Sequence, residues 1–306
     1  MIKRSTFIFC SSILLFPAAL LSQVADPGWL SWSRVSVNAS GSYFLVPWKK
    51  YNESMNLVED AIQYSPSYQN PRGALERING DGTAGAAVSY RIYSGLSLFV
   101  SSSYLTGGGS FDVTYGTTYP FQTTQQMRLH VWEHGAGLKF TQELSRDISI
   151  SVFGLAQRSF GTLVLDYHFL PPSFDEQFSA DLRDKRWSAR TGIGIQYRVY
   201  HDIALVSSVE YRWLKFPELR GNGTYTERRL MPANESSYSS YFPAQLGEAD
   251  GYFGLMIPSE FSGYVPTQLL HTLWSSTPAQ EWWYTEKPTA LDLSGIGISF
   301  GIRYEF

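Results

Sequence analysis

The chain has 306 residues and a formal net charge of −3, so no polyanion partner is implied and we expect no nucleic acid to bind. Charged residues make up only 17% of the sequence, whereas Phe, Trp and Tyr make up 16%. The single cysteine, Cys10, lies near the N-terminus, which excludes disulfide frameworks, thiolate metal sites and cysteine nucleophiles from everything that follows it.

Residues 1–22 are predicted to form a secretory signal peptide. Lys3 and Arg4 supply the positive start, and residues 7–21 form an apolar run without charge. Small or polar residues follow at Ser22 and Ala25, so cleavage is expected after one of these two positions. We therefore expect an exported protein with a single mature domain over residues 26–306.

The region after the signal shows alternation of period two and no further apolar run of about twenty residues, the length that a transmembrane helix needs. If this region spans a membrane, it must do so with strands that close on themselves, because lipid offers no partner to an open sheet edge. Eight strands are predicted, in chain order, at 35–46, 83–93, 95–105, 128–142, 148–169, 187–200, 203–213 and 295–306.

Two of these strands carry the argument. In 295–306, every second residue from Ile296 to Phe306 is apolar or aromatic, and the alternate face is Gly, Ser or charged. This pattern suits lipid on one side and a narrow lumen on the other. In 148–169, the apolar residues change phase between Val152 and Leu163, which predicts a bulge or kink within 154–161.

The connections alternate in length. Short turns are expected at 94–95, 144–147 and 201–202, and long loops at 47–82, 106–127, 170–185 and 217–294. Short turns on one side and long loops on the other predict an all-β, antiparallel, up-and-down transmembrane barrel of eight strands with long extracellular loops. The last loop could hold two more strands, with residues 251–257 as the best piece, so ten strands remain the alternative. Its many prolines favour a loop.

At this point the chain resembles the small bacterial outer-membrane barrels of OmpA/OmpX type. The signal, the alternation of turns and loops, and the terminal row Ile302, Tyr304 and Phe306 carry the resemblance. It implies a location in the Gram-negative outer membrane, contact with its lipid and lipopolysaccharide, and recognition of the terminal row by the barrel-assembly machinery.

Charged residues recur on the face predicted to line the lumen: Arg34, Arg91, Lys139, Arg190, Arg198, Glu210, Arg212, Arg303 and Glu305. One interpretation is an ion-selective pore. The other is a set of ion pairs that fills a closed barrel, since an eight-stranded barrel has room only for side chains or one small ligand. We expect the filled lumen, because buried charges must be paired.

Aromatic residues at strand ends predict a girdle at the membrane surface: Tyr43, Tyr104, Trp132, Trp187, Tyr197 and Trp213. His130 and His134 share a face with Trp132 and are predicted to belong to this girdle rather than to a metal site, because no third ligand is identifiable. No metal and no cofactor are expected.

Asp166 and His168 share one face of a strand near its loop end, where a carboxylate could orient an imidazole that activates water. The couple resembles that of omptin-type outer-membrane proteases, which face it with a pair of aspartates. The sequence contains no Asp-x-Asp, and Glu248 and Asp250 are the nearest substitute. An outer-membrane hydrolase is therefore kept as a second alternative, and we expect that the chain is not an enzyme.

The loops are the surface left free for recognition. Trp274, Trp282, Trp283 and Tyr284 lie in the largest loop and are the candidate contacts for an unknown extracellular partner or surface glycan. The sequence thus predicts a structural or surface-interaction barrel with a filled, charged interior. A narrow porin-like conduit, or a conduit for small apolar ligands, is the first alternative.

Overall fold

The structure is a computed structural model. It describes residues 34–45, 72–75, 80–115, 121–170, 174–229, 245–255, 270–274 and 290–306. The predicted signal peptide lies outside these ranges. Within them, no helix is long and apolar enough to cross a membrane.

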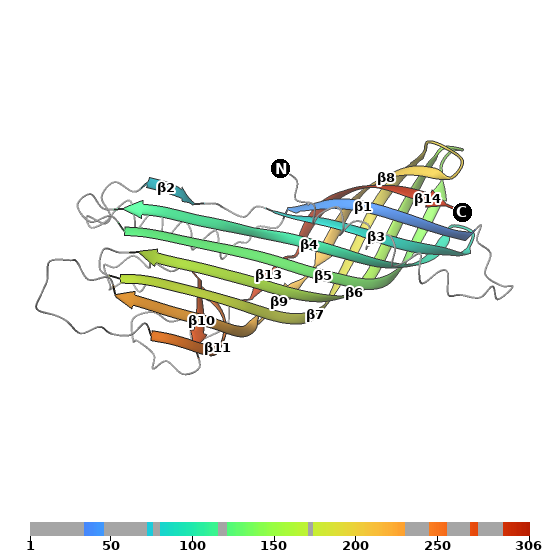
Figure 1. The fold of residues 1–306 in the computed structure, drawn as a ribbon. Helices are drawn as coiled ribbons and strands as arrows, with labels where there is room; N and C mark the ends of the chain where they lie inside the picture. Colours follow the sequence, from blue (N-terminus) through green and yellow to red (C-terminus); the bar gives the residue numbers. More distant parts are fainter. Residues whose placement is uncertain are drawn as a thin grey trace, which may run out of the picture.

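Eight antiparallel strands form a closed ring. Figure 1 shows these strands from the side. In chain order they are β1 (Val35–Leu45), β3 (Gly80–Tyr93), β4 (Leu96–Tyr115), β5 (Phe121–Glu143), β6 (Ile148–Leu170), β7 (Phe174–Arg198), β8 (Ile203–Trp213) and β14 (Gly295–Glu305). Each strand pairs with its neighbour in this order, and the first pairs with the last from Ser36↔Glu305 to Leu45↔Ile296. The predicted eight-stranded up-and-down barrel is confirmed.

All eight predicted strands are present, joined at one end by short turns at 94–95, 144–147 and 199–202. Three strands run much further than predicted: β4, β5 and β7 contain 20, 23 and 25 residues. β6, with 23 residues, lies within one residue of its predicted range of 148–169. The predictions of loops over 106–127 and 170–185 are therefore wrong for most of their length, because the strands continue beyond the ring.

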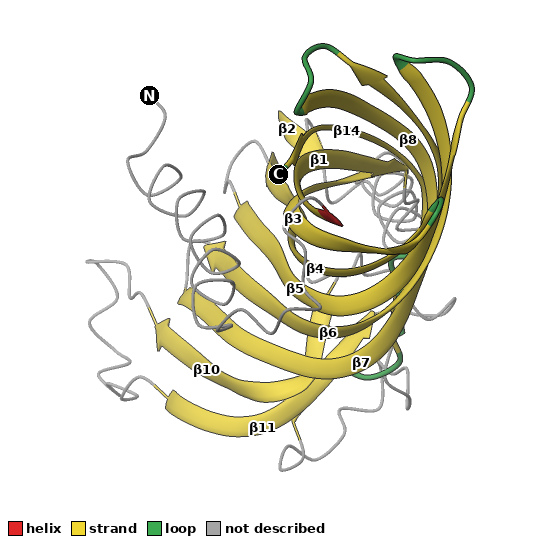
Figure 2. Ribbon diagram, turned by 90° about the vertical axis from the view of Figure 1, so that its right-hand side faces the viewer, coloured by secondary structure: helices red, strands yellow, loops and turns green. Residues whose placement is uncertain are grey.

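The longer strands build an extension of the sheet at the end opposite the turns (Figure 2). Beside β7, past the point where β8 ends, lies β10 (Arg220–Arg229), followed by β11 (Gln245–Leu255) and β12 (Leu270–Trp274). β2 (Arg72–Leu75) pairs with β4 on the other side. The predicted loops at 47–82 and 217–294 thus contain strands, but β11 and β12 lie outside the ring, so the ten-strand barrel is not formed.

The chain leaves the sheet between β8 and β10. Here β9 (Lys215–Phe216) pairs with β13 (Leu291–Asp292), just before β14, and with no other of the described strands. Leu214, Phe216 and Leu293 are all but completely buried. A Cβ atom at Gly161 of β6 would lie 2.6 Å from the ring of Phe216, so this glycine allows the ring to pack directly on the inner wall.

Strand β6 explains the change of phase seen in the sequence. Its register is continuous with β5 and with β7, so the predicted bulge in 154–161 is absent. Instead, the apolar residues of the strand change from the outer face to the inner face. Val152 is exposed on the outside near the turns, whereas Leu163 and Leu165 are buried on the inside further along. Exposed apolar residues on the outside therefore give way to buried ones on the inside between Val152 and Leu163, the pattern expected where a strand passes from lipid to water.

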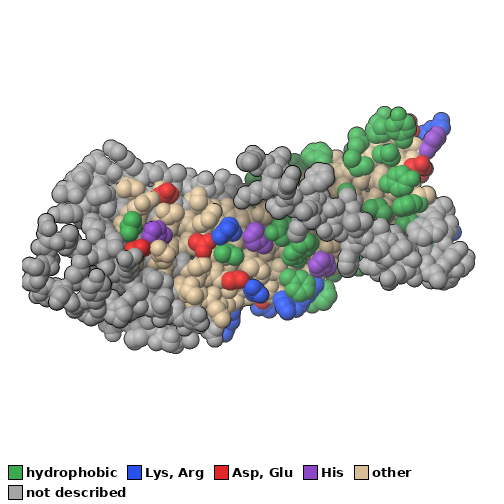
Figure 3. Space-filling model, viewed as in Figure 1, with side chains coloured by type: hydrophobic (Ala, Val, Ile, Leu, Met, Phe, Trp, Pro, Cys, Tyr) green, Lys and Arg blue, Asp and Glu red, His purple; other side chains and the backbone are tan. Residues whose placement is uncertain are grey.

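The outer face of the ring carries the apolar band that lipid requires (Figure 3). Its aliphatic members, which are at least 45% exposed, include Leu98, Val100, Leu138, Val152, Ile193, Ile195, Leu205, Val209, Ile296, Ile298 and Ile302. The outer surface beyond this band carries the charged and His side chains of the extension. The barrel spans a membrane with strands, and the charged outer surface of the extension lies outside its apolar band.

Candidate functional site: the lumen and its turn-end mouth

Near the extension, a layer of paired charges crosses the lumen. Glu133 of β5 is fully buried, and one of its oxygens lies 2.7 Å from Arg190 Nη2 of β7. The hydroxyl groups of Ser103, Ser159 and Ser188 lie 3.3–3.4 Å from the same carboxylate, and Ser159 Oγ and Ser188 Oγ also share a hydrogen bond of 2.7 Å. Glu133 therefore contacts a cation and hydroxyl groups, the partners that a buried carboxylate requires.

The remaining charges of this layer are held in the same way. Arg190 Nη1 lies 3.5 Å from Glu210 of β8, and Arg212 Nη2 lies 3.0 Å from Asp81 of β3, with both partners of the second pair fully buried. The guanidinium of Arg212 also donates to the backbone carbonyl oxygen of Leu293 at 2.9–3.0 Å. We call Asp81, Glu133, Arg190, Glu210 and Arg212 the paired layer.

An aromatic ring completes this layer. Phe44 of β1 is fully buried, with the guanidinium carbon of Arg212 4.3 Å and that of Arg190 5.2 Å from its centroid. Both distances lie within the range of cation–π attraction. A Cβ atom at Gly297 of β14 would come within 2.6 Å of this ring, so the glycine leaves the space that Phe44 fills. Towards the extension, the buried side chains of Leu214 and Phe216 follow.

Two cavities lie between the paired layer and the turns. The inner cavity, of about 110 Å³, is lined largely by Ser side chains together with Phe99 and Phe153. The outer cavity, of about 370 Å³, lies at the turn-end mouth. Gln196 and Arg303 line both, and Arg303 Nη1 donates to Gln196 Oε1 at 2.7 Å, so this hydrogen bond stands at the boundary.

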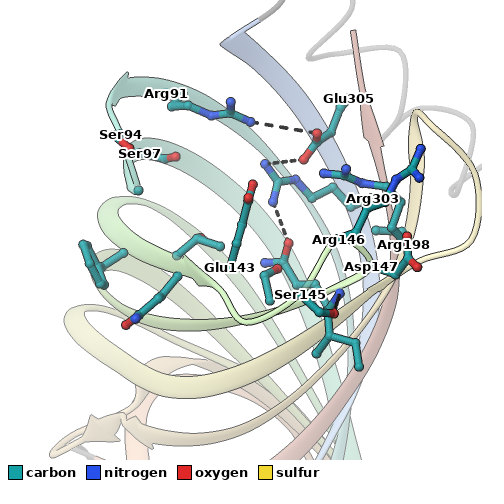
Figure 4. A pocket seen from close by; sticks show the side chains of 18 residues that line it. Arg91, Ser94, Ser97, Glu143, Ser145, Arg146, Asp147, Arg198, Arg303 and Glu305 are labelled. Atoms are coloured by element: carbon teal, nitrogen blue, oxygen red, sulfur yellow. Dashed lines mark hydrogen bonds and ion pairs between the residues drawn. The ribbon is translucent and has the colours of Figure 1, made fainter.

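The outer cavity is rich in cations (Figure 4). Arg91, Arg146, Arg198 and Arg303 line it together with Glu143, Asp147 and Glu305. Glu305 lies 3.0 Å from Arg303 and 3.9 Å from Arg91. Lys139 lines the adjoining inner cavity, and it makes no hydrogen bond or ion pair with the residues that the structure describes.

The predicted lumen charges thus divide into two groups. Arg190, Glu210 and Arg212 belong to the paired layer, whereas Arg91, Lys139, Arg198, Arg303 and Glu305 lie around the two cavities. Arg34 is exposed at the start of β1. The sequence interpretation missed two carboxylates. Glu133 alternates with the outward Trp132 and so could have been found, but Asp81 fell inside a segment expected to be a loop.

The predicted girdle residues lie on the outer face of the ring. Tyr43, Trp187, Tyr197 and Trp213 are 49–71% exposed, and Tyr104 packs against Trp132 with ring centroids 4.9 Å apart. His130 and His134 join this outer surface. His130 Nδ1 lies 2.7 Å from the Tyr104 hydroxyl, and His134 stacks on Trp132 at 5.9 Å. Within the described residues, no three His, Cys, Asp or Glu are grouped as a metal site would require.

Asp166 and His168 lie on the outside of the extension, not in the lumen. Asp166 accepts from Arg128 Nη2 at 2.5 Å and from Ser179 Oγ at 2.7 Å, and His168 Nε2 lies 2.8 Å from Asp175. Through the register of β6, β7, β10 and β11, the backbone of Glu248 lies three strands from Asp166 in the same sheet. The facing arrangement that the hydrolase alternative requires is therefore not formed.

The terminal row points outward, with Ile302 57%, Tyr304 43% and Phe306 51% exposed. The candidate loop contacts Trp282, Trp283 and Tyr284 lie outside the described residues. Trp274 ends β12, and the structure places its backbone only.

A closed antiparallel ring with an apolar outer face, a polar inner face and short turns at one end defines an outer-membrane β-barrel. No model of a protein family matches the sequence, and no match is found among the curated proteins.

Among solved structures, a major outer membrane protein of Thermus thermophilus is 7% identical, with a TM-score of 0.35, covering 89% of this chain and 99% of its own. A bacterial polysaccharide outer membrane secretin is 6% identical, with a TM-score of 0.14, covering 90% and 100%. OmpF of Salmonella typhi, in complex with daunomycin, is 7% identical, with a TM-score of 0.10, covering 90% and 99%. The assignment to the class rests on the ring and its apolar band.

Proposed function

We propose that this protein is a non-enzymatic barrel of OmpA/OmpX-type architecture whose lumen is closed and whose extension and loops serve a structural or surface-interaction role. The paired layer carries the proposal. Glu133, Asp81 and Arg212 are fully buried, and Phe44 lies against both arginines. A hydrated path through this level would have to separate buried ion pairs, and each separation leaves an uncompensated charge.

Conductance across a planar bilayer tests the closed lumen. We expect the folded protein to add no reproducible openings above those of a protein-free detergent control. Heat-modifiable mobility on a gel would verify that the added protein is folded. Reproducible large openings would refute the closed lumen and favour the narrow conduit, whose path would then run through the two cavities below the paired layer.

The extension supports the interaction role. It continues the barrel wall beyond the apolar band, and buried Leu163, Leu165 and Leu182 give it an apolar interior of its own. A folded platform of this kind holds its loops at little cost in entropy. We infer that residues of the largest loop, with Trp274, Trp282, Trp283 and Tyr284 as candidate contacts, bind an extracellular partner or a surface glycan.

Replacing Trp282, Trp283 and Tyr284 with Ala tests this contact. The barrel, reconstituted in lipid nanodiscs, should lose its binding to the lipopolysaccharide or surface polysaccharide of its own outer membrane, while its folded gel mobility stays unchanged. Trp213→Ala, in the girdle, is the matched control and should retain binding. Equal binding by the triple variant and the control would refute the role of this aromatic group.

We also propose that the outward row Ile302, Tyr304 and Phe306 is the segment that the barrel-assembly machinery reads. Deleting Phe306 should lower the amount of folded protein in the outer membrane, because the deletion removes the last member of the lipid-facing row. Normal levels together with normal heat-modifiable mobility would contradict this role.

A further inference from the structure

Four strands of the ring bring cations together at the turn end of the lumen: Arg91 of β3, Lys139 of β5, Arg198 of β7 and Arg303 of β14. These charges influence one another. Lys139 interacts electrostatically with Arg91 and Arg303, and Arg303 does so with Arg91 and Arg198. In the described part of the chain, Glu305 is the carboxylate that interacts with both Lys139 and Arg303. We call these four cations and Glu305 the mouth cluster.

The pairing of the mouth cluster by protein groups is incomplete. Glu305 contacts Arg303 and, at 3.9 Å, Arg91, but Lys139 has no hydrogen bond or ion pair with the described residues. The Nε atom of Arg303 is buried and lacks an acceptor among the described residues, but so do Nε of Arg190 and Nη1 of Arg212 in the paired layer. The lack of any hydrogen bond or ion pair between Lys139 and the described residues is therefore what distinguishes the mouth cluster. Adding Lys139 to the four arginines that line the outer cavity gives five cations against the three carboxylates Glu143, Asp147 and Glu305. Water reaches the exposed Arg91, Arg146 and Arg198, whereas Lys139 and Arg303 are less accessible, and Glu305 is the carboxylate that interacts with both. An anion bound beside Lys139 and Arg303 would compensate their charge.

The cavity beside these cations has the size and chemistry of a small-ligand site. Its volume is about 370 Å³, and the hydroxyl groups of Ser97, Ser145 and Ser149 join the arginines in its lining. Figure 4 shows Arg91, Glu305 and Arg303 along one side of the mouth, with the turn residues Ser145, Arg146 and Asp147 near Arg198. Guanidinium groups favour planar or tetrahedral oxyanions, which accept two hydrogen bonds from one arginine.

We propose that the turn-end mouth binds a small free oxyanion, either a phosphate or a carboxylate, between Lys139, Arg303 and the arginines at the rim. In this class of barrel the short turns face the periplasm, so the ligand would come from that side. The site does not depend on whether the barrel conducts, and its test uses no conductance.

The test is the urea midpoint of unfolding in zwitterionic detergent, with inorganic phosphate titrated at constant ionic strength. The midpoint of the parent protein should rise with phosphate, because a ligand that binds only the folded state stabilises it. In Lys139→Gln the apparent affinity for phosphate should fall about tenfold, as expected for the loss of one charge-assisted contact. Arg91→Gln, at the more exposed rim, should give a smaller loss in the same direction.

Lys185→Gln is the matched control, since Lys185 is a cation on the outer face with no ion pair among the described residues. Its phosphate response should equal that of the parent. The proposed site would be overturned if the urea midpoint of the parent protein does not change with phosphate. It would also be overturned if phosphate raises the midpoint of Lys139→Gln and of Lys185→Gln equally. A second arm replaces phosphate with anionic lipid in the detergent. If the anionic lipid stabilises the barrel and free phosphate does not, the free-oxyanion proposal is wrong.

Discussion

The charged side chains at the two ends of the lumen differ in how they are paired. In the paired layer, Glu133 meets Arg190 and three hydroxyl groups, and Asp81 meets Arg212. In the mouth cluster, Glu305 contacts Arg303 and Arg91, and Lys139 has no hydrogen bond or ion pair among the described residues. Both groups belong to one barrel, yet each cation of the paired layer has a carboxylate within 3.5 Å, whereas Lys139 of the mouth cluster has none among the described residues.

Access to water explains the difference. Arg212 and Asp81 are fully buried, so only protein groups can balance them. The side chains of Arg91 and Glu305 are 48% and 26% exposed at the mouth, where ions from solution can reach. A lumen charge that faces a cavity can therefore belong to a binding site, whereas one enclosed by side chains serves as structure.

Removing one carboxylate from the paired layer and one from the mouth cluster is the strongest test of this difference. Glu133→Ala should destabilise the barrel by about 3–5 kcal/mol, because it leaves the buried Arg190 with only its longer contact to Glu210. Glu305→Ala should cost about 1 kcal/mol or less, since water replaces the lost contacts at the mouth. The measurement is urea unfolding in phosphate-free detergent. Equal losses would mean that both ends are structural in the same sense.

The comparison also requires that lipid surrounds the barrel at the level of both groups. Substitutions on the outer face of β6 test where the lipid ends. Val152 and Val164 share its outer face, twelve residues apart in the chain. Val152→Lys should cost about 2–4 kcal/mol, because it places a charge within the apolar band. Val164→Lys, on the extension, should cost at most about 1 kcal/mol. Unfolding in lipid vesicles decides, and similar costs would contradict the proposed boundary.

The aromatic ring of the paired layer predicts a smaller effect. Phe44→Leu should cost about 2 kcal/mol, because it removes the π face that lies against Arg190 and Arg212 as well as some packing. Phe99→Leu is the control, since Phe99 is also buried in the lumen and its ring contact is to Phe153. A thermal melt in detergent should rank Phe44→Leu as the less stable. The reverse order would show that the cation–π contacts add nothing.

The smallest predicted effect has the opposite sign. In oxyanion-free buffer of low salt, Lys139→Gln should stabilise the barrel by about 1 kcal/mol, because it removes one of four neighbouring like charges. Urea unfolding of the variant beside the parent measures it. A loss of stability in that buffer would mean that Lys139 already has a partner of its own.

Period-two alternation made the eight strands of the ring predictable, because lipid and lumen impose opposite demands on alternate residues. The extension was not predictable in this way. At 121–126 the sequence is Phe-Gln-Thr-Thr-Gln-Gln, whose polar residues suit a strand outside the membrane as well as a loop. The change of phase in β6 predicts a bulge from the sequence alone, whereas the register of the strand is continuous and its apolar residues move from the outer to the inner face.

The lumen charges were predictable as a set and not as pairs. Arg212 meets Asp81 across 131 residues of sequence, and only the closed ring fixes that distance. The incomplete pairing of Lys139 follows from the positions of Arg303 and Glu305 on a strand at the far end of the chain. Such differences depend on spacings across the lumen, which alternation along one strand does not record.

The contrast between the two ends is tested most directly by locating an anion. Crystals of the folded barrel soaked in selenate, a tetrahedral oxyanion whose selenium scatters anomalously, should show an anomalous peak among Lys139, Arg91 and Arg303. The account predicts no peak beside Arg190 or Arg212, whose charges are already balanced. An empty mouth cluster, or a peak in the paired layer, would contradict it.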